Sequence, residues 1–174
     1  MQEAMSIEGY DALVEEFKYL LEVEKPKTAE EKLVAAALGD RSENADYQAA
    51  KEKLRFIDKR LFYLNKMIQN AKVIDPSLHE HKKVSFGSTV ILNNIDTDEE
   101  ERYTICGVLE SEPENGLISV HSPLARAMLG REVGDEIKVK LPNGTKEYEI
   151  EDIFYENIYS LKKNIRTKND YAFH

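Results

Sequence analysis

The sequence contains one cysteine, Cys106, and no tryptophan among its 174 residues. A single thiol excludes an internal disulfide framework and a zinc site built from paired cysteines. Long apolar runs are also missing, since no stretch approaches the roughly 18 residues of a membrane-spanning helix, and the start of the chain lacks the pattern of a signal peptide. We therefore expect a cytoplasmic protein with no membrane partner.

The residue sets typical of an enzyme are missing as well. The sequence has no phosphate-binding glycine loop and no nucleophile triad, and its four histidines lack metal-ligand spacing. His79 and His81 fall in a polar segment, where solvent exposure is expected. The chain therefore shows no sign of an active site of its own.

Basic residues are fewer than acidic ones, which gives a net charge of -9 and argues against a simple nucleic-acid binder. The local balance differs, because residues 47–73 carry seven basic and two acidic side chains, a local charge of +5. On composition alone, a solvated helix face explains this run.

Two segments in the first part of the chain have the three- and four-residue apolar spacing of a coiled-coil seam, residues 10–20 and 54–71. With Gly39 in the polar stretch between them, they predict an antiparallel helical hairpin. About 30 residues per arm gives a length of about 45 Å. Ser6 is the expected N-cap. Pro26, followed by a capping-box pattern at residues 28–31, predicts a kink or a helix restart.

Beyond Pro76 the spacing becomes strand-like and rich in β-branched residues. Pro142-Asn143-Gly144 predicts a hairpin turn, and residues 123–129 a short helix with Ser122 as N-cap and Pro123 at its first position. The expected strands are residues 88–92, 103–108, 116–120, 136–141 and 146–150.

These patterns predict an α+β protein made of a helical hairpin and a small antiparallel sheet with one short helix. The expected parts are a coiled-coil hairpin at residues 1–76, a linker at 77–83, a sheet domain at 84–160 and a basic tail at 161–174. The tail carries four basic residues against one acidic. A hairpin whose seam pairs with itself favours a monomer.

Carboxylates gather at the turn between the two expected helices. Asp40 and Glu43 are three residues apart, and Asp46 follows three residues later. One interpretation is local: Asp40 and Ser42 cap the second helix, and Glu43 and Asp46 suit the positive end of its dipole. The other is that Asp40 and Glu43 bind a divalent cation. Because magnesium prefers six oxygen ligands, such a pair needs further ligands from a partner.

Four motifs follow one another along the chain, and they are Gly39-Asp40-Arg41-Ser42-Glu43-Asn44-Ala45-Asp46-Tyr47-Gln48-Ala49-Ala50-Lys51, Val73-Ile74-Asp75, Phe86-Gly87-Ser88-Thr89-Val90 and Ile118-Ser119-Val120-His121-Ser122-Pro123-Leu124-Ala125-Arg126-Ala127. In this order they resemble the motifs of the bacterial Gre transcript cleavage factors, nearer to GreA than to GreB, and the resemblance covers residues 5–155. It implies an antiparallel coiled coil followed by an FKBP-like domain that binds at the rim of the secondary channel of RNA polymerase.

The resemblance implies an accessory factor rather than an enzyme. Such a factor stimulates the polymerase's own cleavage of backtracked RNA, whose 3′ end lies in the secondary channel, and so rescues arrested complexes. In this family pattern, Asp40 and Glu43 hold a Mg²⁺ ion shared with the polymerase, which then has the two metals used for phosphodiester cleavage. Asn44 and Tyr47 are expected to position the RNA or the attacking water.

Two further groups of residues follow from the same resemblance. Basic residues at the tip and on the arm that leaves it are expected to contact RNA phosphates. The loop and short helix of the second domain are expected to bind the polymerase, while ordinary core packing is the alternative explanation for Leu124, Ala127 and Leu129. The RNA contacts are Arg41, Lys51, Lys53, Arg55, Lys59 and Arg60, and the polymerase contacts are Ser122, Pro123, Leu124 and Arg126.

The tip departs from the usual family pattern, because Ala36-Ala37-Leu38 precedes Gly39 and Arg41 follows Asp40. Arg41 either competes with metal binding or adds a phosphate contact. Three other functions stay open. A channel regulator would inhibit or modulate polymerase without stimulating cleavage, a prolyl isomerase would need an aromatic-lined pocket, and a coiled-coil adaptor would not need the acidic tip.

Overall fold

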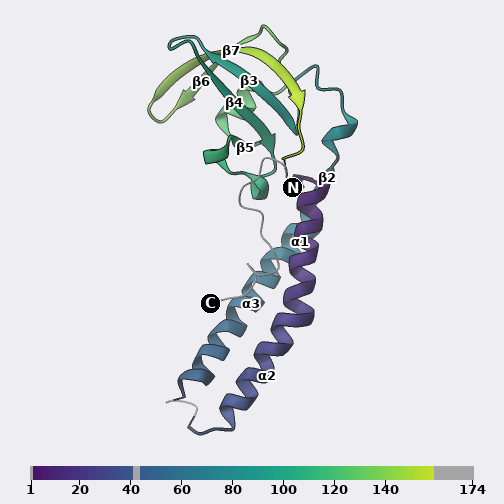
Figure 1. Ribbon diagram of the computed structural model, residues 1–174, viewed down its shortest axis with the longest axis vertical. Helices are drawn as coiled ribbons and strands as arrows, with labels where there is room; N and C mark the ends of the chain where they lie inside the picture. Colours follow the sequence, from purple (N-terminus) through teal and green to yellow (C-terminus); the bar gives the residue numbers. More distant parts are fainter. Residues whose placement is uncertain (1, 41–43, 159–174) are drawn as a thin grey trace. The chain divides into compact units, whose positions relative to one another are not determined.

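The structure is a computed structural model that describes residues 2–40 and 44–158. The chain divides into two compact units (Figure 1). Residues 10–70 form one unit, here called the hairpin unit. The described residues before and after it, 2–9 and 71–158, form the other, here called the sheet unit. Among the described residues, no helix has the length and apolar character needed to cross a bilayer.

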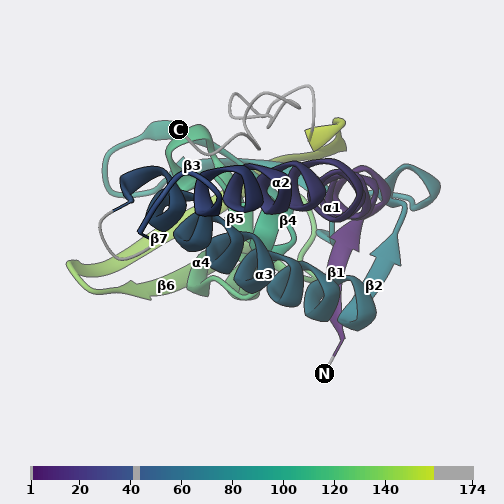
Figure 2. The same cartoon turned by 90° about the horizontal axis from the view of Figure 1, so that it is seen from below.

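The hairpin unit is built from two antiparallel helical arms. Figure 2 shows α2 and α3 side by side, and the ion pairs Glu16–Arg60 and Glu24–Lys53 show that the arms run in opposite directions. This arrangement confirms the expected hairpin. The first arm consists of α1 (Ile7–Tyr19), the π-helical turn η1 (Leu20–Glu24) and α2 (Lys25–Ala36), and the second arm is α3 (Ala45–Asn70).

The sequence predicts a kink or a helix restart at Pro26, and the structure instead shows a continuous helical backbone that widens into η1 just before this residue. The backbone N–H of Lys25 donates to the carbonyl of Leu20, five residues back, and both Tyr19 and Lys25 keep right-handed helical angles. Because proline lacks an N–H and its ring crowds the carbonyl four residues earlier, a wider preceding turn accommodates Pro26 inside the helix. The capping-box prediction is wrong, since Thr28 lies inside α2 and its buried Oγ1 has no hydrogen-bond partner among the described residues.

The sheet unit contains a five-stranded sheet in the order β5-β4-β3-β7-β6. Neighbouring strands are antiparallel except for β4 and β5, which are parallel. The predicted α+β class is confirmed, with the difference that the sheet is mixed. The elements are β3 (Ser88–Asn94), β4 (Glu99–Cys106), β5 (Leu117–Ser119), α4 (Pro123–Met128), β6 (Glu136–Leu141) and β7 (Gly144–Tyr155), with short 3₁₀ helices η2 (Pro76–Leu78), η3 (Val108–Glu110) and η4 (Pro113–Asn115).

The core of the sheet unit holds α4 against the sheet. Ser122 caps α4, because its Oγ accepts a hydrogen bond from the backbone N–H of Ala125 at 3.2 Å, as expected. The β6–β7 turn is also confirmed, since Leu141 pairs with Gly144 and leaves a two-residue loop. The buried core consists of Val84, Val90, Leu92, Ile105, Ile118, Ala125, Met128, Ile137, Val139, Tyr148, Ile150 and Ile153.

A second, two-stranded parallel sheet pairs β1 (Glu3–Ser6) with β2 (Ala71–Ile74). The sequence analysis assigns both segments to a hairpin domain at residues 1–76, whereas the structure groups them with the sheet unit. The division differs because each strand satisfies its backbone groups on the other rather than within a helix. The two ends of the hairpin therefore leave from adjacent strands.

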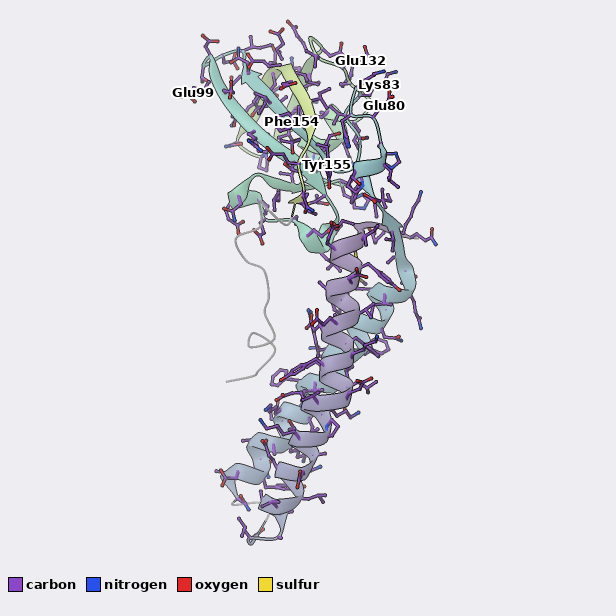
Figure 3. All side chains as sticks on the ribbon, turned by 45° about the vertical axis from the view of Figure 1, so that its right-hand side comes forward. Glu80, Lys83, Glu99, Glu132, Phe154 and Tyr155 are labelled. Atoms are coloured by element: carbon purple, nitrogen blue, oxygen red, sulfur yellow. The ribbon has the colours of Figure 1, made fainter. Side chains whose placement is uncertain are left out.

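The expected linker at residues 77–83 is tied to the sheet unit by His81. The two ring nitrogens of His81 lie 2.7 Å from Ser88 Oγ and 2.7 Å from the carbonyl oxygen of Pro76. Its ring also stacks on Tyr155, labelled in Figure 3, with centroids 5.5 Å apart. His79 is exposed as expected, but His81 is half-buried, which corrects that expectation.

The buried carboxylate of Glu110, at the end of η3, anchors the start of α1. It accepts hydrogen bonds from the hydroxyl and the backbone N–H of Ser6 and from the backbone N–H of Gly107. Ser6 Oγ in turn accepts from the N–H of Gly9 at 3.1 Å, which confirms Ser6 as the N-cap. A Cβ on residue 9 would overlap the Glu110 carboxylate, so glycine is required for this close approach.

Candidate functional site

Asn44 organises the second helix at the tip of the hairpin. Its Oδ1 accepts a hydrogen bond from the backbone N–H of Tyr47 at 3.1 Å, and its Nδ2 donates to the carbonyl oxygen of Ala35 at 2.6 Å. Asn44 is thus the N-cap of α3 and also joins α3 to the end of α2. One interpretation of the sequence had Asp40 and Ser42 as caps of this helix; α3 begins at Ala45 with Asn44 as its cap, and Ser42 lies outside the described residues.

The carboxylates expected at the tip are described in part. Asp40 is exposed in the connection between α2 and α3, and Asp46 is exposed in the first turn of α3. Glu43 and Arg41 lie outside the described residues. Over residues 2–40 and 44–158, no three His, Cys, Asp or Glu side chains are grouped so as to hold a metal ion.

Tyr47, the weaker of the predicted positioning residues, lies one turn into α3. Its half-buried ring packs beneath the ammonium group of Lys32, with Nζ 5.8 Å from the ring centroid. This contact joins the two arms close to the tip. The ammonium group lies over one face of the ring. A role of the Tyr47 side chain in positioning RNA stays a prediction.

The basic residues of α3 fall into two groups. Lys53 Nζ lies 2.7 Å from Glu24 Oε1, and Arg60 is bidentate to Glu16 at 2.7 and 3.0 Å. Both cations are matched by buried carboxylates of the first arm, which gives them a structural role inside the hairpin, and their contact with RNA stays a prediction. The other three predicted RNA contacts on α3 are exposed, and they are Lys51, Arg55 and Lys59.

Burial and ion pairing act in opposite directions on Glu24. Desolvation by burial raises its pKa, but the hydrogen bond and positive charge of Lys53 more than offset this, so that the pKa of Glu24 is lowered. Tyr19 Oη donates to Glu24 Oε2 at 3.2 Å, and burial together with the Glu24 charge raises the pKa of Tyr19. The carboxylate is therefore held in its charged form inside the hairpin.

The predicted polymerase-binding residues surround the start of α4. Pro123 and Arg126 are exposed, whereas Leu124 packs against the core together with Ala127 and Leu129, as the core-packing interpretation expected. Ser122 is occupied as the N-cap of α4. Of the four predicted polymerase contacts, Pro123 and Arg126 are therefore the exposed ones.

Ion pairs at other edges of the sheet unit fix its loops. Lys83 and Glu132, both labelled in Figure 3, form an ion pair at 3.5 Å beside the backbone bridge that joins the same two residues. The Arg102 guanidinium lies 5.4 Å from the ring centroid of Phe154 and pairs with Glu156. These contacts stabilise the sheet unit itself, and we assign no functional role to their residues.

Two family models match the chain. The model described as "Transcription elongation factor, N-terminal" matches residues 3–73. The model described as "Transcription elongation factor, GreA/GreB, C-term" matches residues 79–155. Together they span both units and most of the described residues.

Curated relatives are similar over nearly their whole length. Transcription elongation factor GreA of Nautilia profundicola is 50% identical over 157 residues, which cover 90% of this chain and 97% of the relative. The GreA protein of Helicobacter pylori strain Shi470 is 49% identical, over 90% of this chain and 96% of the relative. Among solved structures, GreA factor homolog 1 of Thermus thermophilus has 21% identity and a TM-score of 0.42, over 88% of this chain and 99% of that chain.

Proposed function

The chain belongs to the GreA/GreB family of transcription elongation factors, and from this membership we propose that it stimulates transcript cleavage by bacterial RNA polymerase. In this proposal the hairpin enters the secondary channel of the polymerase, and backtracked RNA is cut so that an arrested complex resumes elongation. The polymerase performs the cleavage, and the chain acts as an accessory factor.

The observation that carries the proposal is the placement of Asp40. Its carboxylate is exposed in the short connection between two long helices, where no core packing requires an acidic residue. Asn44, rather than Asp40, caps the second helix. An exposed carboxylate in the connection between two long helices supports a role toward a partner.

Asp40 and Glu43 act as ligands for a Mg²⁺ ion that is shared with the polymerase. Two carboxylates supply too few oxygen ligands for magnesium, and the described residues offer no further cluster, so the chemistry of this donor set fits a shared ion. When bound, the ion supplies charge stabilisation for the attacking and leaving oxygens. The part of this chain is to hold carboxylate oxygens at the place where the RNA is cut.

Exposed cations on α3 guide the extruded RNA toward the tip. Lys51, Arg55 and Lys59 project their charges into solvent over the first half of the helix. Positive side chains along this face attract RNA phosphates without sequence preference. Pro123 and Arg126 of α4 bind the rim of the polymerase channel, which keeps the hairpin in the channel.

The test uses purified bacterial polymerase stalled in a backtracked complex with end-labelled RNA and Mg²⁺. The native chain is expected to raise the rate of RNA shortening at least about 100-fold, and Asp40→Ala and Glu43→Ala each to remove most of that increase. Glu30→Ala, which deletes an exposed carboxylate of α2, is the matched control and keeps the native rate. No acceleration by the native chain would refute the proposal.

A further inference from the structure

An exposed stripe of α3 lies opposite the seam that packs on the first arm. The seam side of this helix carries the buried residues Ile57, Leu61 and Leu64. On the other side, exposed residues recur at steps of four, four, three and four, which places them along one line of the helix surface. This group, here called the outer stripe, consists of Lys51, Arg55, Lys59, Phe62 and Lys66.

The outer stripe is positively charged, although the chain as a whole has a net charge of -9. Four of its five residues are cations, and the side chain of Arg55 is 81% exposed. Two carboxylates lie near the stripe. Asp58 pairs with Lys25 of the first arm at 2.7 Å, and Glu52 lies 3.8 Å from Arg55. Because cations remain in excess, this face of α3 attracts a polyanion.

Phe62 is the feature of the outer stripe that its charge does not explain. Its side chain is 76% exposed and lies outside the apolar cluster of the hairpin. Exposure of a phenylalanine ring to water is unfavourable, so the folding of the hairpin does not account for this residue. The next residue, Tyr63, is already in contact with Arg60, whose guanidinium lies 5.3 Å from the ring centroid. Phe62 is therefore the ring that the stripe offers to a partner.

An aromatic ring between two cations fits a single-stranded nucleic acid. Lys59 is three residues before Phe62 and Lys66 is four residues after it, so a cation flanks the ring on each side along α3. An unpaired base can stack on the ring while the neighbouring phosphates contact the two ammonium groups. Since every base has a stacking face, such binding needs no sequence preference. Bases in a duplex are already stacked on one another and cannot use the ring.

Charge separates Phe62 from another exposed apolar side chain of the hairpin. Leu33 of α2 is 73% exposed, but its neighbours three and four residues away are Glu30 and alanines, with no cation among them. A protein bound through apolar contact alone does not require cations around the ring, whereas a polyanion does. The outer stripe therefore favours single-stranded RNA over a protein surface.

We propose that the outer stripe is a binding site for single-stranded RNA, in which Phe62 stacks on a base and Lys59 and Lys66 contact the adjacent phosphates. Phe62 lies about 26 Å along α3 from its first residue, Ala45, at about 1.5 Å per residue. The site is thus separate from the carboxylates of the tip. During cleavage it holds extruded RNA that is long enough to reach the middle of the hairpin. This last step rests on the proposed function, whereas binding of RNA to the free chain does not.

The absence of tryptophan from the sequence allows a direct test with the free protein. Phe62→Trp places one indole in the outer stripe, and Leu33→Trp places one at a similarly exposed position without flanking cations. A twelve-nucleotide RNA without secondary structure is expected to quench at least about half of the fluorescence at residue 62 and less than about a tenth at residue 33. A duplex of the same RNA is expected to quench less than about a tenth at both.

Stacking is separated from apolar contact by titration of the labelled RNA with further variants. Phe62→Leu keeps an apolar side chain but cannot stack, and it is expected to weaken binding about tenfold, whereas Phe62→Tyr stays within twofold of the native affinity. Lys59→Ala should lower the slope of log affinity against log salt by about 0.7, because one phosphate contact is lost. Leu33→Ala is the control and stays within twofold.

Three results would overturn the site. Equal quenching at residues 62 and 33, or none at either, would show that RNA does not bind at the outer stripe. Equal quenching by duplex and single strand would show attraction to phosphates without stacking. Native affinity of the Phe62→Leu protein for RNA would show that the ring serves an apolar contact with a protein instead.

The role during cleavage is tested with polymerase complexes backtracked by two and by ten nucleotides. Phe62→Leu is expected to raise the half-saturating concentration of the chain about fivefold with the longer extruded RNA and less than twofold with the shorter one. Equal effects on both complexes would overturn the assignment of extruded RNA to this site. A native chain that accelerates cleavage in neither complex would instead refute the proposed function and leave the fluorescence result standing.

Discussion

The two units of the protein are held together in different ways. The sheet unit has a core of twelve buried apolar residues, whereas the buried apolar cluster of the hairpin unit has four. The hairpin adds buried carboxylates, Glu16 and Glu24, each paired with a cation of the opposite arm. Apolar burial is non-directional and supplies stability, while ion pairs are directional and select one alignment. Apolar burial therefore supplies most of the stability of the sheet unit, whereas the ion pairs of the hairpin fix the alignment of its two arms.

The largest expected effect comes from a cavity in the sheet core. Leu92→Ala should lower the free energy of unfolding of the sheet unit by about 4 kcal/mol, because Leu92 is fully buried at the centre of that core. Urea unfolding followed by tyrosine fluorescence measures the change. Leu78→Ala, at an 80% exposed leucine, is the control and should cost less than about 0.5 kcal/mol. Equal losses in both proteins would contradict the assigned core.

A leucine-to-alanine change in the hairpin tests whether the two units unfold separately. Leu64→Ala removes one of the four buried apolar side chains and should cost about 3 kcal/mol of hairpin stability. Helical circular dichroism should fall at lower urea, while amide exchange in β3 and β7 keeps its native protection. Loss of protection in the two strands at the same urea concentration would show that the two units unfold as one.

A third change tests the buried carboxylate of the sheet unit, Glu110, which accepts hydrogen bonds from the backbone instead of pairing with a cation as the buried carboxylates of the hairpin do. Glu110→Ala leaves the backbone N–H groups of Ser6 and Gly107 without their acceptor and should cost about 2 kcal/mol. Thermal unfolding checks the loss. Glu114→Ala, at an exposed position nearby, should leave the midpoint temperature of unfolding unchanged. A similar drop in the Glu114→Ala protein would show that the loss does not come from the buried hydrogen bonds of Glu110.

The smallest effect at neutral pH concerns Tyr103. Burial and its hydrogen bond to Glu101 raise the pKa of Tyr103 to about 12. The folded pKa lies above the unfolded value of about 10, so this contribution to stability is present below pH 10 and is lost as the pH rises toward 12. Tyr103→Phe should weaken the pH dependence of the unfolding free energy in that range. An identical dependence in native and variant proteins would contradict the assignment.

Spacing in the sequence was enough to predict most elements of the fold. The coiled-coil seams indicated the hairpin, and Ser122, Pro123 and the Asn143-Gly144 turn marked α4 and the β6–β7 hairpin correctly. These features depend on local physics, in which a cap, a ring or a positive backbone angle acts within a few residues. Local signals of this kind can be recognised without knowing what lies across the core.

Features that depend on distant partners were missed. Pro26 indicated a kink or a restart, but the spacing in the sequence did not show that the helix would continue through a widened turn with Thr28 buried. Lys53 and Arg60 look like exposed cations in the sequence, and only the opposite arm shows their carboxylate partners. Periodicity supplies a partial signal, because both residues lie one position from the seam residues Leu54 and Leu61.

The pairing of β1 with β2 has a consequence for the order in which the protein forms during synthesis. Glu3 of β1 is synthesised well before its partner Ala71, which follows only after the whole hairpin has been made. Folding of the hairpin brings the two strands together and shortens the chain loop that must close between them. The arms can thus assemble first and hold the two ends of the hairpin in the positions from which β1 and β2 pair.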